Sequence, residues 1–248
     1  MKIISAYSIK GGVGKTALAV NLAYALRETG RRTLLIDLDP QGAAAFYFRV
    51  DPAGKFRMKN TRSFGEGLRR NIRESNYPGL DILPSNLAYR HLDILLDRME
   101  KSRKQLRRVL DALREEYDVV VLDCPPNITL LSENIFRASD LILVPVIPTT
   151  LSRRTFEQLL EFFRDKDLPE KILVPFFSMA QSRNSLHREI LASLPLAHPS
   201  FLKSVIPYSA EIEKMGLRRM PVLASAPSKP STKAYRALCA EILNILEP

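Results

Sequence analysis

A glycine-rich stretch near the amino terminus, residues 8–16, constrains the fold of this chain more than any other feature. It reads SIKGGVGKT and lies between a short apolar run, 2–7, and a segment with helical periodicity. Gly11, Gly12 and Gly14 leave backbone N–H groups open to an anion, because no Cβ blocks the approach. The stretch therefore predicts a strand, a phosphate-binding loop and a helix, in that order.

Two lysines and a threonine give this loop its chemistry. Lys15 can reach the outer phosphates of a nucleotide, and the Thr16 hydroxyl can bind Mg²⁺. The strict phosphate-loop pattern has a glycine five residues before Gly14, where this chain has Ile9. A second lysine, Lys10, precedes the glycine pair. This departure from the pattern is the most informative feature of the sequence.

Two later apolar runs end in acids. They read TLLID at 33–37 and YDVVVLD at 117–123, and a continuous apolar run is typical of a parallel strand that is covered on both faces. The ligand crevice of an open α/β sheet lies at the carboxyl ends of its strands, so Asp37, Asp39 and Asp123 are expected to face the nucleotide. An acid at the end of the second run can hold Mg²⁺ through water.

The alternation of strands and helices with short links predicts an α/β fold. We expect one domain over 1–248, with a single doubly wound, mostly parallel sheet of seven to eight strands flanked by helices. Beside the runs already named, strands are expected at 80–84, 141–146, 172–177 and 201–207, and helices at 16–27, 152–164, 185–194 and 231–246.

The chain is strongly basic, with a net charge of +10. Such a field attracts polyanions, either nucleic acid or an acidic membrane surface, while a solvated basic surface without a partner is the alternative. Residues 49–73 hold eight basic side chains and are expected to be rich in loops, because glycines and a proline interrupt them. Residues 98–108 predict a strongly basic helix. The sequence gives no role to either stretch.

Composition excludes several classes of protein. Cys124 and Cys239 are too few for a disulfide framework or a cysteine-rich metal site, and we expect both to be packed thiols. The sequence contains no run of 18 apolar residues, so it predicts no membrane-spanning helix. A strand that begins directly after Met1 leaves no room for a signal peptide.

Three motifs together resemble the ParA/MinD family of deviant Walker A P-loop ATPases. They are Lys10–Thr16, Asp37–Gly42 and Tyr117–Pro126, which occur in the family's order, and the resemblance covers nearly the whole chain. Softer similarities favour the ParA-like branch, in the small form without an N-terminal helix-turn-helix. Two departures are Ala17, where a second threonine is frequent, and Cys124, which stands in place of threonine or serine.

The resemblance implies roles for single residues. Lys10 would be the signature lysine, which reaches across an ATP-sandwich dimer to the partner's phosphates, and Asp39 would orient the attacking water. The implied catalytic residues are Lys10, Lys15 and Asp39; the implied metal site comprises Thr16, Asp37 and Asp123; and the implied nucleotide site comprises Lys10, Gly11, Gly12, Val13, Gly14, Lys15, Thr16, Ala17 and Pro207.

The resemblance also implies a function, with ATP and Mg²⁺ as cofactors. A partition or positioning ATPase of this kind forms a homodimer with ATP, binds DNA non-specifically, and is released when a ParB-like or cargo adaptor protein stimulates hydrolysis. It would lie in the cytoplasm, associated with the nucleoid when ATP is bound. The cargo is not decided by these motifs. The implied DNA contacts are Arg153, Arg154, Lys203, Arg218 and Arg219.

A MinD-like, membrane-associated positioning ATPase is the alternative function. That branch ends in an amphipathic helix with basic residues on one face. Residues 239–248 have acids where a lipid anchor would have bases, so core packing and no membrane partner are expected here. A nucleotide-regulated binding module without hydrolysis is also open.

Overall fold

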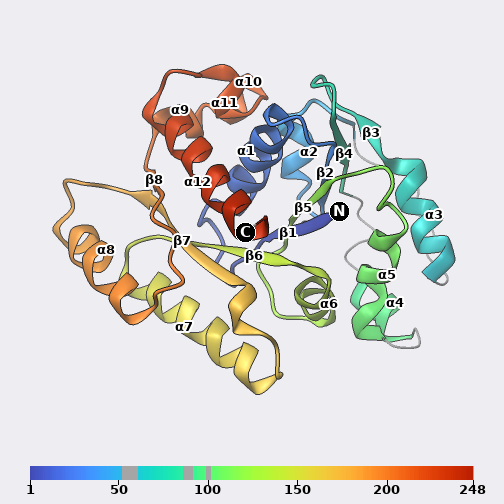
Figure 1. The fold of residues 1–248 in the computed structure, drawn as a ribbon, viewed down its shortest axis with the longest axis horizontal. Helices are drawn as coiled ribbons and strands as arrows, with labels where there is room; N and C mark the ends of the chain where they lie inside the picture. The colour runs from blue at the N-terminus through green and yellow to red at the C-terminus, as the bar shows by residue number, and fades with distance from the viewer. Residues whose placement is uncertain (52–60, 86–91, 99–101, 248) are drawn as a thin grey trace.

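A computed structural model describes residues 1–51, 61–85, 92–98 and 102–247 of the chain. Its centre is an eight-stranded sheet with the order β3-β4-β2-β5-β1-β6-β7-β8 (Figure 1). Every neighbouring pair is parallel except β3 and β4. The predicted fold class is therefore confirmed. The strands are β1 (Lys2–Ala6), β2 (Thr33–Asp37), β3 (Arg73–Glu74), β4 (Leu80–Leu83), β5 (Val119–Asp123), β6 (Leu141–Val146), β7 (Leu173–Ala180) and β8 (Val205–Pro207).

Helices cover both faces of the sheet (Figure 1). Successive strand residues point to opposite faces, so Ile3 packs into one apolar cluster and Ile4 into the other. The first face carries α3 (Thr61–Asn71), α4 (Leu92–Asp97), α5 (Gln105–Asp111), α6 (Leu130–Ala138), α7 (Thr150–Asp165) and α8 (Ser185–Ala197). The second carries α1 (Lys15–Glu28), α2 (Ala43–Tyr47), α9 (Ala210–Glu213), α10 (Met215–Arg218), α11 (Val222–Ser225) and α12 (Pro230–Leu246).

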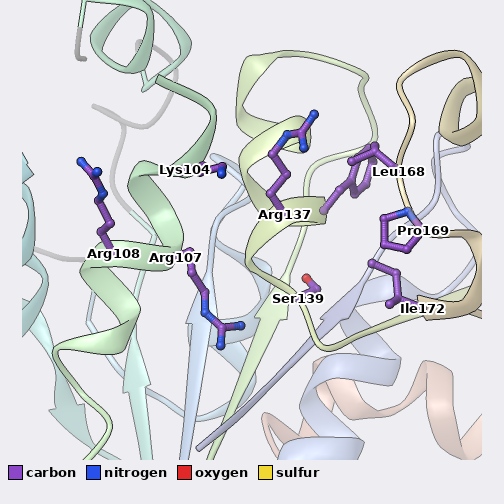
Figure 2. A pocket seen from close by; sticks show the side chains of 9 residues that line it. Lys104, Arg107, Arg108, Arg137, Ser139, Leu168, Pro169 and Ile172 are labelled. Carbon is purple, nitrogen blue, oxygen red and sulfur yellow. The ribbon is translucent and has the colours of Figure 1, made fainter. Parts of the chain in front are cut away.

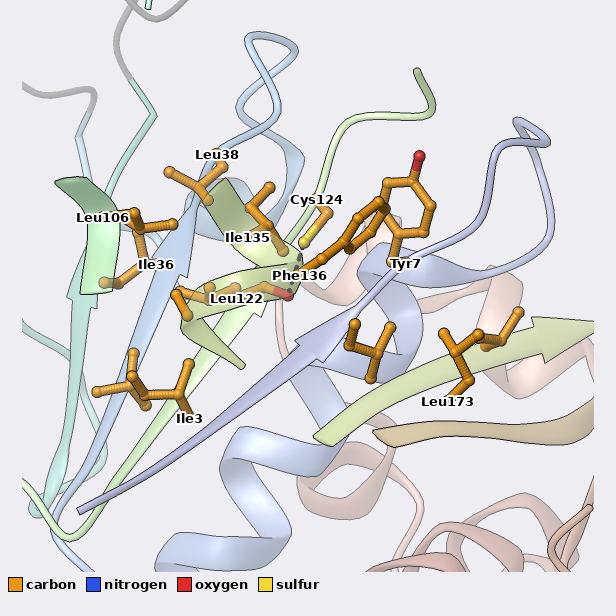
Figure 3. Close-up of a cluster of buried hydrophobic side chains, with 14 of the residues drawn as sticks. Ile3, Tyr7, Ile36, Leu38, Leu106, Leu122, Cys124, Ile135, Phe136 and Leu173 are labelled. Carbon is orange, nitrogen blue, oxygen red and sulfur yellow. Dashed lines mark hydrogen bonds between the residues drawn. The ribbon is translucent and has the colours of Figure 1, made fainter. Parts of the chain in front are cut away.

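Buried aromatic rings fix the nucleotide-loop end of β1 against α6 (Figure 3). The Tyr7 and Phe136 rings meet edge to face with their centroids 4.7 Å apart. The Tyr7 hydroxyl also donates a hydrogen bond of 3.0 Å to the carbonyl of Asn127, in the loop before α6. Cys124 lies buried in the same cluster, and Cys239 is buried in the other, as expected for packed thiols. The start of α6 is therefore tied to the strand that feeds the glycine-rich loop.

The expectation that 49–73 is rich in loops was wrong for the second half of this stretch. The structure forms α3 there, although Gly65 and Gly67 lie inside it. Leu68 is 2% exposed in the apolar cluster, and a Cβ on Gly65 would lie 3.8 Å from Val109 of α5. Burial and close helix packing therefore outweigh the low helix propensity of glycine. Residues 52–60 lie outside the described part of the chain.

The basic helix expected at 98–108 was also wrong in its extent. Residues 99–101 lie outside the described part, a 3₁₀ turn η2 covers Ser102–Lys104, and α5 begins only at Gln105. The Asn134 side chain accepts hydrogen bonds from the backbone N–H groups of Gln105 and Leu106, at 3.0 and 3.3 Å. A side chain of α6 thus fixes the point at which the α-helix starts.

The last helix packs into the core, as the acidic end of the sequence predicts. Tyr235, Leu238 and Ile242 of α12 are buried in the second apolar cluster. Glu247, just past the helix, pairs with Arg31 at 2.7 Å. Among the described residues, no helix combines the length and apolar character needed to cross a bilayer.

Candidate functional site

The topology brings the predicted acids to one edge of the sheet. β5 lies between β1 and β2, and Asp37 and Asp123 are register partners at the carboxyl ends of β2 and β5. Ala6, which ends β1, is the register partner of Asp123 on the other side. The glycine-rich loop starts directly after β1, so loop and carboxylates share the crevice that parallel sheets use for ligands.

The loop has a backbone that only glycine adopts easily. Gly12 and Gly14 have φ angles of 72° and 93°, which lie in the left-handed region. A Cβ on Gly14 would also lie 3.2 Å from the Ser178 hydroxyl at the end of β7. α1 begins at Lys15 with no acid in its first turn, so its free N–H groups and positive dipole end face the loop. The loop is built to hold an anion.

Ile9, the residue that breaks the strict loop pattern, has a packing role. Its side chain packs against the apolar cluster on the α7 face of the sheet. It lines a small hollow together with Phe156 and Leu159 of α7. A glycine here would leave this contact empty, so Ile9 holds the first half of the loop against α7.

Lys15 lies inside the cradle that its own loop forms. Its side chain is 7% exposed, and its ammonium donates to the carbonyl of Lys10 at 3.1 Å. Burial lowers the pKa of Lys15, and the charge of Asp123 opposes this shift. The ammonium is thus directed into the loop, where a phosphate would meet it.

Asp37 is fully buried and holds the turn that follows β2. Its Oδ2 accepts hydrogen bonds from the N–H groups of Ala44 and Ala45 at 2.9 and 3.4 Å, and its Oδ1 accepts from Asp39 at 3.2 Å. Burial raises the pKa of Asp37 to about 7 in spite of these bonds. Asp37 is therefore an organiser of the site, fixing α2 as well as the approach to Asp39.

Asp123 is a buried acid of this edge that accepts no hydrogen bond from the described part of the chain. It is 0% exposed, and neither carboxylate oxygen has a hydrogen-bond partner within the described ranges. Burial raises its pKa well above the usual range, the charge of Asp37 adds to the shift, and the nearby Thr16 hydroxyl opposes it. A buried carboxylate without a partner costs free energy, so its presence indicates a missing cation.

A magnesium ion fits this donor set. Carboxylate and hydroxyl oxygens suit Mg²⁺, which keeps several waters and binds protein through few side chains plus phosphates. In keeping with this, no group of three His, Cys, Asp or Glu able to hold a metal alone occurs in the described part of the chain. Thr16, Asp37 and Asp123 would hold the ion together with the ligand's phosphates.

Asp39 is half-buried and has a free acceptor. Its Oδ1 accepts from the N–H of Gln41 at 2.9 Å, and its carbonyl accepts from the Ser85 hydroxyl at 2.6 Å. Its Oδ2 has no hydrogen-bond partner in the residues the structure describes. The carboxylate is thus fixed on one side and available to a water molecule on the other.

Lys10 turns away from the cradle toward α7. Its ammonium donates to the Ser152 hydroxyl at 3.2 Å. Sequence reasoning missed Ser152, which looked like an ordinary residue of a helix start; the Thr149 hydroxyl caps α7 instead, accepting from the Ser152 N–H. Only the placement of α7 beside the loop brings together two residues 142 positions apart.

The other implied nucleotide residues lie at the same edge or in the loop. Val13 is buried and Ala17 is half-buried in the first turn of α1. Pro207 ends β8, next to β7, whose Ser178 and Met179 lie beside Gly14. Pro207 therefore lies on the strand next to β7, and β7 is the strand that approaches the glycine-rich loop.

The implied DNA contacts do not form one patch. Arg153 and Arg154 are exposed at the start of α7, whereas Arg218 and Arg219 lie on the other face of the sheet beside α2. Lys203 precedes β8, which is the outermost strand at the end of the sheet away from β3. Arg218 is paired with Glu211 at 2.8 Å, and the Arg219 guanidinium lies 4.6 Å from the centre of the Phe46 ring.

Comparisons with known proteins find relatives over nearly the whole chain. The family model of an AAA domain matches residues 1–171. The chain is 31% identical to an uncharacterised protein of Pseudomonas putida, covering 98% of this chain and 94% of that one. It is 31% identical to the cell division protein PomZ of Myxococcus xanthus, covering 95% and 76%. It is 28% identical to the chromosome partitioning protein ParA of Caulobacter vibrioides, covering 98% and 94%.

Solved structures share the whole fold. The cobyrinic acid a,c-diamide synthase of Mycobacterium smegmatis, with bound ADP and magnesium, matches with a TM-score of 0.78 at 25% identity, covering 100% of this chain and 96% of that one. A putative plasmid partition protein of Borrelia burgdorferi, bound to AMPPNP, matches with a TM-score of 0.78 at 23% identity, covering 98% and 99%. The second likeness concerns the fold alone.

Proposed function

The chain belongs to the ParA-like family of P-loop ATPases, and on that premise we propose that it is a partition or positioning ATPase that hydrolyses Mg-ATP in a homodimer. The observation that carries the proposal is the buried, unpartnered carboxylate of Asp123 beside Thr16 and Asp37. The Mg²⁺ ion of bound Mg-ATP would place a positive charge beside this carboxylate. The similar synthase structure, which has bound ADP and magnesium, supports a nucleotide and Mg²⁺ as the ligands here.

The protein's own residues divide the work at this site. The loop N–H groups and Lys15 bind the phosphates, and Thr16, Asp37 and Asp123 hold the metal, directly or through water. The metal neutralises charge that develops on the phosphates during transfer. Asp39 accepts a hydrogen bond from the attacking water through its free oxygen and orients the water toward the terminal phosphate.

The position of Lys10 favours a site that is completed by a second subunit. Lys15 already fills the cationic position of the cradle, and the Lys10 ammonium lies on Ser152 of its own chain. We infer that Lys10 leaves this contact when two subunits meet and supports the phosphates bound by the partner. A cation supplied in trans contributes about 10³–10⁵ in rate in well-studied phosphoryl-transfer enzymes.

DNA is the proposed surface on which the dimer acts. The charge of +10 favours sequence-independent phosphate contacts, whose affinity falls with salt because counterions are released. Arg153, Arg154 and Lys203 are exposed and are the candidates that support this best. Because the five candidate residues are divided among three places in one subunit, a dimer is needed to present them as a wider surface.

A ParB-like or cargo adaptor protein is the proposed stimulating partner, and the cytoplasm, with ATP-dependent association with the nucleoid, is the proposed location. A MinD-like membrane function has less support, because Tyr235, Leu238 and Ile242 of α12 are buried in the core. The relatives' names support partition and cell division alike, so the cargo is proposed only as DNA or a protein assembly.

The Lys10→Ala variant tests this proposal. We expect light scattering to detect a dimer with a slowly hydrolysed ATP analogue for the wild-type protein and a monomer for the variant, with unchanged circular dichroism. Lys2→Ala, which removes an exposed lysine of β1, is the matched control and keeps the dimer. DNA should bind with ATP but not with ADP, and binding should weaken steeply with salt. Equal DNA binding in both nucleotide states, or a normal dimer in Lys10→Ala, would refute the cycle.

A further inference from the structure

A basic groove runs along the edge of the sheet opposite the nucleotide site. Two hollows of about 430 and 580 Å³ share Lys104, Arg108 and Arg137 in their walls, and we call these three residues the basic groove. The first hollow also includes Ser139 and Ile172, which lie just before the amino ends of β6 and β7. Its place is therefore the amino edge, whereas Asp37 and Asp123 lie at the carboxyl edge.

The three cations of the groove have no anionic partner among the residues that the structure describes. Within the described ranges, neither an ion pair nor a side-chain hydrogen bond is formed by Lys104, Arg108 or Arg137. Lys104 and Arg108 are exposed, while the Nε of Arg137 is buried and lacks an acceptor. A buried guanidinium donor without an acceptor costs free energy, so it indicates a ligand that supplies one.

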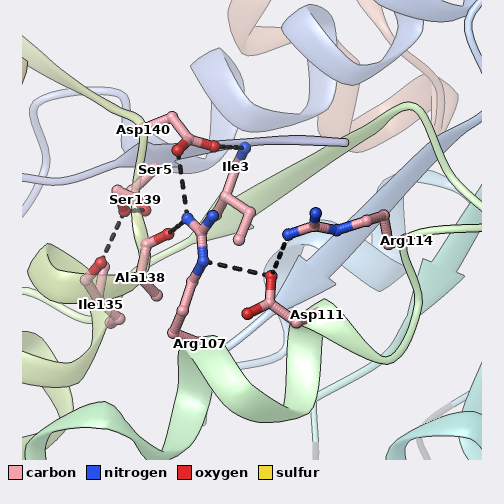
Figure 4. Close-up of polar contacts among 9 residues, drawn as sticks. All are labelled: Ile3, Ser5, Arg107, Asp111, Arg114, Ile135, Ala138, Ser139 and Asp140. Carbon is pink, nitrogen blue, oxygen red and sulfur yellow. Dashed lines mark hydrogen bonds and ion pairs between the residues drawn. The ribbon is translucent and has the colours of Figure 1, made fainter.

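The neighbouring arginines are engaged and do not compete for such a ligand. Arg107 donates to the Ala138 carbonyl at 2.8 Å and pairs with Asp140 at 3.2 Å and with Asp111 at 3.3 Å (Figure 4). Arg103 pairs with Glu133 at 2.9 Å. These pairs hold α5 and α6 together and leave the three groove cations free.

The opposite wall of the groove is apolar. Leu168, Pro169 and Ile172 lie on the other side of Arg137 from Lys104 and Arg108 (Figure 2), and Phe136 of α6 completes the lining. The hollow thus presents cations along one side and hydrocarbon along the other. Pockets of this size and mixed character bind ligands that carry a charge beside an apolar group.

We propose that the basic groove binds an acidic segment of a partner protein, in which carboxylates flank one large apolar side chain. Arginine forks match carboxylates bidentately, and the apolar wall would cover the side chain between them. Two joined hollows suit an extended chain better than one compact ligand. The inference goes beyond the proposed function, because the groove shares no residue with the nucleotide site.

Nucleic acid fits the groove less well. Phosphates gain nothing from the wall formed by Leu168, Pro169 and Ile172, and a stiff duplex does not bend into a hollow of this size.

A labelled synthetic peptide, in which glutamates flank one phenylalanine, tests the proposal by fluorescence anisotropy with the full chain. We expect saturable binding that Lys104→Gln/Arg108→Gln weakens about tenfold or more, the size of one or two charge-assisted hydrogen bonds. Lys229→Gln/Lys233→Gln removes the same charge from exposed positions at α12 and should change binding less than about twofold. Replacing the peptide's glutamates by glutamines should abolish binding.

Arg137→Lys separates geometry from charge. It keeps the positive charge and removes the guanidinium fork, so we expect weaker peptide binding with an unchanged far-UV spectrum. Absence of peptide binding up to about 1 mM would overturn the proposal. An equal loss in the α12 control pair would overturn it too, as would a groove variant that loses DNA binding and keeps the peptide.

Discussion

Asp118 and Asp140 at the amino edge of the central sheet have polar partners, whereas Asp123 at the carboxyl edge has none in the described part of the chain. At the amino edge, Asp140 accepts from the Ile3 N–H at 2.8 Å and pairs with Arg107, and Asp118 pairs with Arg32 at 2.9 Å. At the carboxyl edge, Asp123 is fully buried with no partner among the described residues. Paired acids hold the fold together, whereas an unpaired buried acid costs stability and is kept for a ligand.

Asp39→Ala, at the carboxyl edge, is expected to have the largest effect, which is a loss of ATP turnover. The carboxylate's free oxygen is placed to orient water, so turnover should fall about 10²–10⁴-fold, the usual contribution of a positioned acid or base. ATP binding and dimer formation should persist, because Asp39 does not hold the phosphates. A steady-state ATPase assay and an ATP-analogue titration measure the two quantities; unchanged turnover would remove Asp39 from the chemistry.

Asp140→Ala tests whether the paired acids of the amino edge stabilise the folded protein. It removes the acceptor of the Ile3 N–H and the partner of Arg107, and the free energy of unfolding should fall by about 1.5–3 kcal/mol. Asp165→Ala, at an exposed acid near the end of α7, is the control and should change it by less than about 0.5 kcal/mol. Urea denaturation compares the variants, and equal stabilities would mean that the amino-edge pairs contribute nothing.

Asp123→Asn should have a smaller effect of the opposite sign. The pKa of Asp37 is raised to about 7 in the folded protein, and that of Asp123 is raised well above its usual range, so folding binds protons. The ligand-free protein therefore loses stability as pH rises from about 4 through these raised values. Removing one of these charges should raise the free energy of unfolding by about 1–2 kcal/mol at pH 8 and by less at pH 5.

Urea denaturation in EDTA, without nucleotide, measures this effect of Asp123→Asn. The control is Asp118→Asn, whose exposed acid has a pKa lowered by hydrogen bonds from Arg32. Its stability loss should be equal at pH 5 and pH 8, because its native and unfolded forms are both ionised at these values. Destabilisation of Asp123→Asn at both pH values would contradict a functional origin for its burial.

The nucleotide edge was largely predictable from sequence because it depends on local patterns. Buried runs that end in Asp37 and Asp123 must meet at one edge of a parallel sheet, and the glycines fix the loop between β1 and α1. The contact of Lys10 with Ser152 was not predictable, because it depends on where α7 packs.

The basic groove was out of reach of sequence reasoning for the same reason. The charge of 98–108 is visible in the sequence, but Arg137 of α6 joins Lys104 and Arg108 only in three dimensions. α3 was missed because Gly65 and Gly67 are usual helix breakers, and the burial of Leu68 against α5 is a tertiary effect. Contacts between segments that are far apart in the sequence form the basic groove and stabilise α3.

Mixing Lys10→Ala with Asp39→Ala protein tests the shared site most directly. If Lys10 acts on the partner's phosphates, a mixed dimer has one complete site, composed of Asp39 from the first variant and Lys10 from the second. A mixed dimer keeps one of its two Lys10 contacts, so mixing should restore turnover well above that of either inactive variant, up to about a quarter of wild type for random pairing. Turnover that stays at the level of the single variants would contradict a lysine supplied in trans.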